Sequence, residues 1–405
     1  MALGGADVAW AADPLGAMTE NPAGLATLTR PELDLAGEGG ILVGKFNKPS
    51  VGSSGNLDGN PLFFPSGAAA LPLEKWPVTF GISVAPESTL VANWRYPDPP
   101  STGGISYGQQ QDESKILVLR SAVGVGVKFS DRFSVGLSGG VLYNRNTLVT
   151  PYIFQNLQGP LAGVNGAKTL LDLHTTGIGW DLQAGMIFRA TTNLQFGASY
   201  TTESVVHSDG TATGDPYAQF HGAPGPLAFQ YDAAVKNVFP QVVRVGASWK
   251  FHPQWRGTAQ VDWLGWGDAF HSLSVNLSNG HNGAAAVLGP NVNDTIPLDW
   301  RNEFVYRAGL EFDPVENLAL RLGYSYGHSP VPDGTLTPMT AGIFEHTLTA
   351  GVGYRWRCVQ FDLAYQYYFP VTQSVGTSSL LAGEYSNSST TVSAHVISLG
   401  MGITF

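Results

Sequence analysis

The sequence predicts an all-β fold: a transmembrane antiparallel β-barrel of about 14 strands, with a small N-terminal helical segment plugging its lumen. Three observations predict it. Only 13% of the 405 residues are charged, although the chain has 10 Trp, 15 Tyr and 20 Phe. Apolar side chains alternate with small or polar ones over segments long enough to cross a bilayer. Short polar turns join these segments at one end and long connections at the other.

The composition excludes several other classes of protein. No apolar run approaches the ~18 residues of a membrane-spanning helix, and the many aromatic residues argue against disorder. The formal charge of −10 argues against a nucleic-acid partner. The single Cys358 excludes a disulfide framework and a multi-cysteine metal site. No cleavable signal sequence is present, so we expect the numbering to begin after a removed export segment.

Residues 1–31 do not alternate and are predicted to form a separate N-terminal unit. They are rich in Ala and Gly, with breakers at Asp13-Pro14 and Asn21-Pro22. Helical stretches are expected around Ala6–Ala12 and Pro14–Glu20. Because the segment is too apolar for a solvated tail and too short to fold alone, we expect it to lie inside a barrel made by residues 32–405.

The strands are predicted by side-chain alternation of period two. In the last segment Ile397, Leu399, Met401, Ile403 and Phe405 share one face, and Ser398, Gly400, Gly402 and Thr404 share the other. The same pattern predicts strands around 117–129, 180–189, 243–251, 304–312, 318–326, 347–356 and 359–369. The minor face is mostly Gly, Ser and Ala, whereas a soluble β-sandwich, the alternative, would show a Lys-, Glu- and Thr-rich face. Aromatic residues at strand ends, such as Trp180, Trp249, Trp356 and Phe405, indicate an interfacial girdle.

The connections divide into two classes by length. Short turns are predicted at 130–132, 191–193, 252–254 and 313–316. Long loops are predicted at 87–113, 149–172, 207–237, 270–298, 328–344 and 371–391. This asymmetry is typical of barrels in the outer membrane of Gram-negative bacteria, with the long loops outside the cell.

With these segments in view, the chain resembles the FadL/TodX family of outer-membrane transporters for long-chain fatty acids and hydrophobic compounds. The resemblance rests on Gly4-Gly5-Ala6, Ala11-Ala12-Asp13-Pro14 and Asn21-Pro22-Ala23-Gly24-Leu25, which are similar to the family's N-terminal hatch. Later matches are 300–306, 320–326, 329–333, 362–365 and the terminal Phe405.

The resemblance implies a monomeric barrel whose hatch, with Asn21, Pro22, Ala23 and Gly24, controls passage. It also implies an inward kink in the third strand that lets an apolar ligand leave sideways into the membrane. That kink maps to Ala85, Pro86 and Glu87, where proline removes a ladder donor. The competing interpretation is that Pro86 only ends the strand.

Two apolar sites are candidates for the ligand. An extracellular groove is predicted from loop residues Leu90, Trp94, Ile153, Phe154, Leu157 and Leu161, because exposed apolar surface of this kind marks interaction sites. An internal pocket is predicted from hatch residues Leu3, Val8, Trp10, Leu15 and Met18. The inward arginines Arg120, Arg244, Arg301, Arg307 and Arg321 are candidate partners for a fatty-acid carboxylate, although nearby acids could neutralise them.

The predicted function is therefore passive uptake of a fatty acid or hydrocarbon, with membrane lipid and lipopolysaccharide as surroundings. No catalytic constellation, cofactor or metal site is predicted: Gly136-Leu137-Ser138-Gly139-Gly140 matches a nucleophile turn only superficially, because it lies within a strand. Two alternatives remain. One is a surface interaction protein, an adhesin or phage receptor, using the Asn-, Ser- and Gly-rich loops. The other is a general polar porin, against which the N-terminal plug argues.

Overall fold

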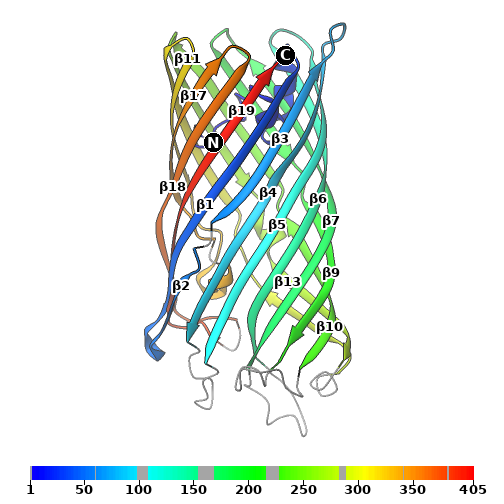
Figure 1. Ribbon diagram of the computed structural model, residues 1–405, viewed down its shortest axis with the longest axis vertical. Helices are drawn as coiled ribbons and strands as arrows, with labels where there is room; N and C mark the ends of the chain where they lie inside the picture. The colour runs from blue at the N-terminus through cyan, green and yellow to red at the C-terminus, as the bar shows by residue number, and fades with distance from the viewer. Residues whose placement is uncertain are drawn as a thin grey trace.

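The computed structural model describes residues 2–59, 61–97, 108–153, 168–215, 228–281, 289–340, 342–380 and 383–405. Most of this chain is β-strand, arranged as one closed barrel with both termini at the same end (Figure 1). No helix in the described ranges is long and apolar enough to cross a membrane. The fold class predicted from alternation is confirmed.

Nineteen strand segments form the wall. They are β1 (Glu32–Lys48), β2 (Ser53–Leu57), β3 (Leu62–Pro72), β4 (Val78–Pro97), β5 (Gln109–Lys128), β6 (Phe133–Ile153), β7 (Lys168–Arg189), β8 (Leu194–Thr201), β9 (Ser204–Gly214), β10 (Phe229–Phe239), β11 (Val242–His252), β12 (Trp255–Leu264), β13 (Ser272–His281), β14 (Val292–Pro297), β15 (Glu303–Val315), β16 (Leu318–Gly327), β17 (His346–Trp356), β18 (Val359–Val375) and β19 (Ser388–Thr404). Five wall strands are interrupted once, namely β2–β3, β8–β9, β10–β11, β12–β13 and β14–β15. The wall therefore has 14 antiparallel strands.

The barrel closes between the first strand and the last. β1 and β19 pair without a break from Glu32 with Thr404 to Asn47 with Ser389. Closure leaves no free edge along this seam, so the backbone groups of both strands are satisfied inside the bilayer. The short turns lie at the end that carries the termini (Figure 1).

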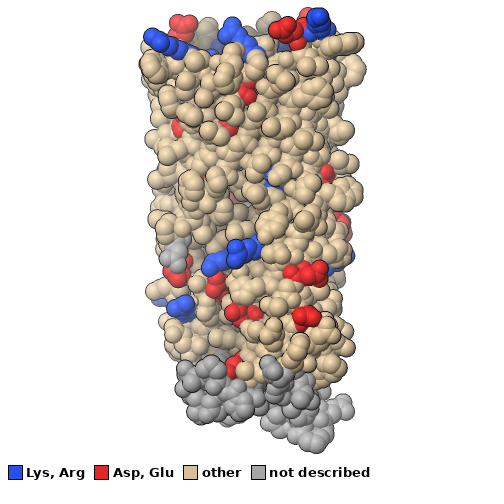
Figure 2. Space-filling view, turned by 45° about the vertical axis from the view of Figure 1, so that its right-hand side comes forward, with Lys and Arg blue, Asp and Glu red and all other residues tan. Residues whose placement is uncertain are grey.

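The apolar face of each alternating segment points out of the barrel. Trp180, Trp249, Trp356 and Phe405 are all more than half exposed. On the face shown in Figure 2, charged side chains gather at the rim beside the termini and in the opposite third of the molecule, with a largely uncharged band between them. This is the surface expected of a barrel whose middle faces lipid.

Several strands extend farther than the sequence predicted. β4 runs to Pro97, and β9, β10, β13 and β14 occupy parts of the expected loops 207–237 and 270–298. In β10 the polarity of the two faces is reversed: Phe229, Tyr231 and Val235 are buried inside, while Asp232 and Lys236 are exposed outside. Beyond the lipid the wall meets water, so its apolar residues turn inward as in a soluble barrel. Apolar residues facing lipid were the signal sought, and this inverted pattern was therefore missed.

The N-terminal segment, Ala2–Pro31, lies inside the barrel near its terminal end (Figure 1). It contains α1 (Pro14–Thr19) and the 3-10 helix η1 (Pro22–Thr27). The helix expected over 14–20 is present, but the one expected over 6–12 is absent. Gly4 and Gly5 have φ of 68° and 75°, a left-handed conformation that an L side chain resists, and this part of the chain forms turns instead.

Candidate functional site

The N-terminal segment packs against strands that carry glycines on their inner faces. Asn21 caps η1, accepting from the Ala23 N–H at 3.1 Å, and its amide donates to the carbonyls of Val8 at 2.7 Å and Met186 at 3.1 Å. A Cβ on Gly136 would overlap the backbone of Pro22 and Ala23, and one on Gly185 would overlap the Asn21 side chain. The small inner face predicted from the sequence thus allows a close approach of the plug to the wall.

The motif residues Asn21, Pro22, Ala23 and Gly24 are buried at this seat. Of the five residues expected to line an internal pocket, Leu3, Trp10 and Leu15 line a cavity in the lumen. Val8 and Met18 instead pack against the wall, at Gly246 for Val8 and at Gly81 and Gly124 for Met18.

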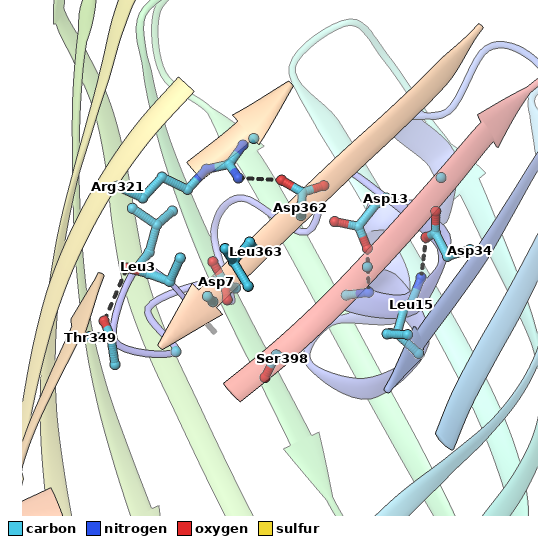
Figure 3. A pocket seen from close by; sticks show the side chains of 18 of the residues that line it. Leu3, Asp7, Asp13, Leu15, Asp34, Arg321, Thr349, Asp362, Leu363 and Ser398 are labelled. Atoms are coloured by element: carbon cyan, nitrogen blue, oxygen red, sulfur yellow. Dashed lines mark hydrogen bonds and ion pairs between the residues drawn. The ribbon is translucent and has the colours of Figure 1, made fainter. Parts of the chain in front are cut away.

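A cavity of about 1780 Å³ lies beside the N-terminal segment. Its other walls are β1 and β15 to β19, and its lining includes Arg355 and Arg357 at the terminal end of the barrel. Polar and charged groups such as Asp7, Asp13 and Asp362 gather here (Figure 3). The cavity has the lining of a water-filled vestibule and not that of an apolar pocket.

The arginines expected to face inward are held by carboxylates. Arg120 Nε lies 2.7 Å from Asp181, Arg307 Nε lies 2.7 Å from Asp262, and Arg244 Nε lies 3.3 Å from Glu20. Arg321 bridges Glu311 at 2.8 Å and Asp362 at 2.6 Å (Figure 3). Arg301 is exposed. Four of the five candidate partners for a ligand carboxylate are therefore occupied by the protein's own acids.

The wall is incompletely paired between β3 and β4. These strands pair from Pro72 with Thr79 up to Gly67 with Val84, and β2 resumes pairing with β4 at Leu57 with Trp94. The Asp58 N–H also bonds the Asn93 carbonyl, at 2.7 Å. Between these contacts, among the described residues, 61–66 at the start of β3 and 85–92 of β4 do not pair with each other, although each stretch pairs with the strand on its other side. We call this stretch the wall gap.

Prolines occupy both edges of the wall gap. Pro65 lies on β3 and Pro86 on β4, and neither has an N–H to donate to a ladder. On the other side of β4 the pairing with β5 shifts register between Pro86 and Ser88, which leaves Glu87 as an extra residue. Leu62, Phe64, Ala85, Pro86, Thr89 and Val91 line the cavity described above, so the wall gap borders that cavity. The strand does not end at Pro86.

An apolar pocket of about 50 Å³ lies in the half of the lumen away from the termini. Leu90, Ile116 and Leu148 contribute from β4, β5 and β6. The opposite side is made by Phe270, Leu273, Ile296, Leu298, Met339 and Leu380. The lining is almost entirely apolar, which suits an uncharged group more than a charged one.

The residues expected to form an extracellular groove are in different places. Leu90 and Trp94 are on β4, not in a loop; Leu90 lines the apolar pocket, and Trp94 is fully buried. Ile153 is the last residue of β6 and is buried. Phe154, Leu157 and Leu161 lie outside the described residues.

A second plug, which the sequence did not reveal, closes the lumen above the apolar pocket. Segments between strands fold inward and contribute Leu298, Trp300, Val331, Leu336, Ile343 and Tyr385, which pack with Phe46, Trp94 and Tyr96 of the wall. We call this set the loop cluster. These segments carry no period-two or helical pattern, so alternation could not identify them.

Asp112 of β5 anchors the loop cluster from within. Its carboxylate accepts hydrogen bonds from Tyr96 at 2.7 Å, Tyr385 at 3.0 Å and Thr150 at 3.1 Å. Burial, and then the charge of Asp112, raise the pKa of the Tyr385 phenol well above its ordinary value. The phenol therefore stays protonated and remains a donor at physiological pH.

A closed 14-stranded barrel with a lipid-facing middle, a plug inside and an apolar pocket defines an integral outer-membrane protein of the transport class. The family model for the outer membrane protein transport protein family (OMPP1/FadL/TodX) matches residues 1–405. The chain belongs to this family, which places it in the outer membrane of a Gram-negative bacterium. No curated protein matches the chain.

Solved structures share the fold. The toluene transporter TodX of Pseudomonas putida superposes with a TM-score of 0.77 at 19% identity, covering 96% of this chain and 93% of that one. A FadL homologue of Pseudomonas aeruginosa gives 0.76 at 15% identity, with 98% and 95% covered. The toluene transporter TbuX of Ralstonia pickettii gives 0.75 at 20% identity, with 100% and 97% covered.

Proposed function

We propose that the protein is a passive, monomeric channel for uptake of hydrophobic small molecules, which leave the lumen sideways through the wall gap. The observation that carries this proposal is the interrupted pairing between β3 and β4, where 61–66 and 85–92 border the inner cavity. An unpaired stretch in a membrane barrel exposes polar backbone groups, which is costly wherever they face lipid. An interruption that carries this cost favours a functional opening.

The route begins in the apolar pocket and ends at the wall gap. Leu90 lines the pocket, and the neighbouring Thr89 and Val91 line the cavity that borders the wall gap, so β4 connects the two spaces. The rest of this cavity, towards the terminal end of the barrel, is lined by polar and charged groups. An apolar molecule would therefore be less stable there. Lipid is then the most favourable destination, and the N-terminal segment acts as a hatch that blocks straight passage.

The proposed ligand is an uncharged hydrocarbon and not a fatty acid. Of the inward arginines predicted as partners for a carboxylate, Arg120, Arg244, Arg307 and Arg321 are each paired with a carboxylate of the chain, which disfavours a fatty acid at these positions. Two of the proteins of similar structure, TodX and TbuX, are toluene transporters, which agrees with a small hydrocarbon as cargo.

Closing the wall gap tests this function. Deleting Glu87 and replacing Pro86→Val removes the extra residue and restores an N–H donor, so β4 can pair along more of its length. Uptake of radiolabelled toluene by cells that express this variant is expected to fall to the level of cells lacking the protein. Pro370→Val is the matched control, because it changes another register irregularity, between Tyr368 and Val371 of β18, away from the wall gap. Undiminished uptake by a folded variant would contradict lateral exit.

A further inference from the structure

The connection between β18 and β19 is folded into the mouth of the barrel. Its described parts, Gly376–Leu380 and Gly383–Asn387, are tied together: the Asn387 N–H bonds the Gly376 carbonyl at 3.1 Å, and the Ser378 N–H bonds the Ser386 hydroxyl at 3.0 Å. We call these two parts the inner loop. These hydrogen bonds hold its two described parts against each other.

Two side chains at the tip of the inner loop hold it against distant strands. Tyr385 is 1% exposed and donates to Asp112 of β5. Glu384 forms an ion pair with Lys168 of β7 at 2.9 Å, and the Lys168 side chain is fully buried. Lys48 of β1 also donates to the Glu384 backbone carbonyl. The tip is thus attached to three wall strands other than its own.

The inner loop covers the apolar pocket. Leu380, in the same loop, lines that pocket together with Thr337, Met339 and Thr340 of the neighbouring connection. Tyr385 and Leu336 belong to the loop cluster, which occupies the lumen beside them. The inner loop therefore forms part of the boundary of the apolar pocket.

Hydration of two buried indole nitrogens would offset part of the free-energy cost of displacing the inner loop. The indole nitrogens of Trp94 and Trp300 are buried in the loop cluster, and within the described part of the chain neither has a hydrogen-bond partner. A buried donor without an acceptor is destabilising. Displacing the inner loop would let water reach these nitrogens, which stabilises the open state relative to the closed one.

We propose that the inner loop is a lid on the apolar pocket, latched by the Tyr385–Asp112 hydrogen bond and the Glu384–Lys168 ion pair, and that its opening admits the ligand. The latch residues are gating residues and do not contact the ligand. The effect on influx rests on the proposed uptake function, whereas the opening itself does not.

Opening is measured by chemical labelling of a buried lid residue. In a Cys358→Ser background, Ser378→Cys places one thiol in the inner loop at a position that is 6% exposed. Tyr385→Phe removes the donor and keeps the ring, so a membrane-impermeant maleimide should label this thiol roughly tenfold faster, as loss of a hydrogen bond to a carboxylate implies. Tyr306→Phe, on a lipid-facing phenol, is the matched control and should leave the rate unchanged. Equal labelling rates in the two variants would overturn the latch.

Influx is measured in the same background. Lys168→Cys with Glu384→Cys, joined by a short bis-maleimide, should abolish toluene influx, while the same variant treated with a monofunctional maleimide should retain it. Full influx through the cross-linked protein would overturn the lid. If the Tyr385→Phe variant labels faster but neither treatment affects influx, the loop opens without gating transport, and the gating proposal fails. Loss of influx in all preparations, including the parent, would instead contradict the uptake function.

Discussion

At the scale of single residues, glycines on the inner face of the barrel leave the space in which the N-terminal segment packs. Gly136 and Gly185 leave room for the backbone and side chain of the N-terminal segment, and Asn21 then satisfies carbonyls of both the segment and β7. The sequence showed the alternating glycines and the Asn-Pro-Ala motif separately. It could not show that one packs on the other, because the contact joins positions more than 100 residues apart.

Gly136→Val should therefore displace the N-terminal segment without preventing assembly of the barrel. The added side chain would overlap the backbone at Pro22 and Ala23, whereas the outer face of β6 is unaffected. The expected result is a barrel with normal heat-dependent mobility on a denaturing gel, but with faster proteolysis within residues 13–24. Gly139→Val, on the lipid-facing side of the same strand, is the control. Unchanged proteolysis of the Gly136 variant would show that packing of the N-terminal segment against the wall does not depend on this glycine.

At the scale of elements, the polarity of the outward-facing side chains along a strand indicates where the lipid-facing part of the barrel ends. Apolar residues of β7 face outward at Leu182 and Trp180, but farther along the same strand the outward positions are polar, at Thr176 and His174. The first pattern was recognised in the sequence and the second was not. A strand in water with a filled interior has the opposite polarity from one in lipid, so strand bounds were underestimated where the environment changes.

An arginine introduced on β7 should report this boundary. Leu182→Arg places a charge in the lipid-facing band and should lower the free energy of unfolding by about 2–4 kcal/mol. Thr176→Arg, on the same face of the same strand, should cost about 1 kcal/mol or less, because it lies nearer water. Denaturant unfolding in lipid vesicles measures both values. Equal losses would mean that the lipid band extends past Thr176.

At the scale of the whole molecule, the lumen is closed twice, by the N-terminal segment near the termini and by the loop cluster near the opposite mouth. Fold class, family and the position of the N-terminal segment were predictable, because alternation and the hatch motif are local patterns. The loop cluster, the apolar pocket and the partners of the arginines were not, because each depends on which strands face one another across the lumen.

Double closure predicts a channel that carries ligand but little current. Protein purified in detergent should yield a co-purified hydrocarbon by mass spectrometry and should show negligible steady conductance in a planar bilayer. A large steady conductance without an apolar ligand would favour an open polar porin.

The height of the barrel has a consequence for which molecules can be taken up. β7 has 22 residues, and at a rise of ~3.3 Å per residue and a tilt of ~40° it stands ~55 Å tall, against a lipid-facing band of ~25 Å. The mouth therefore lies ~30 Å beyond the outer leaflet, among surface sugars and water. On the proposed route a cargo molecule must arrive dissolved in water, so aqueous solubility limits supply. Toluene-sized hydrocarbons meet this condition, whereas long alkanes would be scarce at the mouth however well they fit inside.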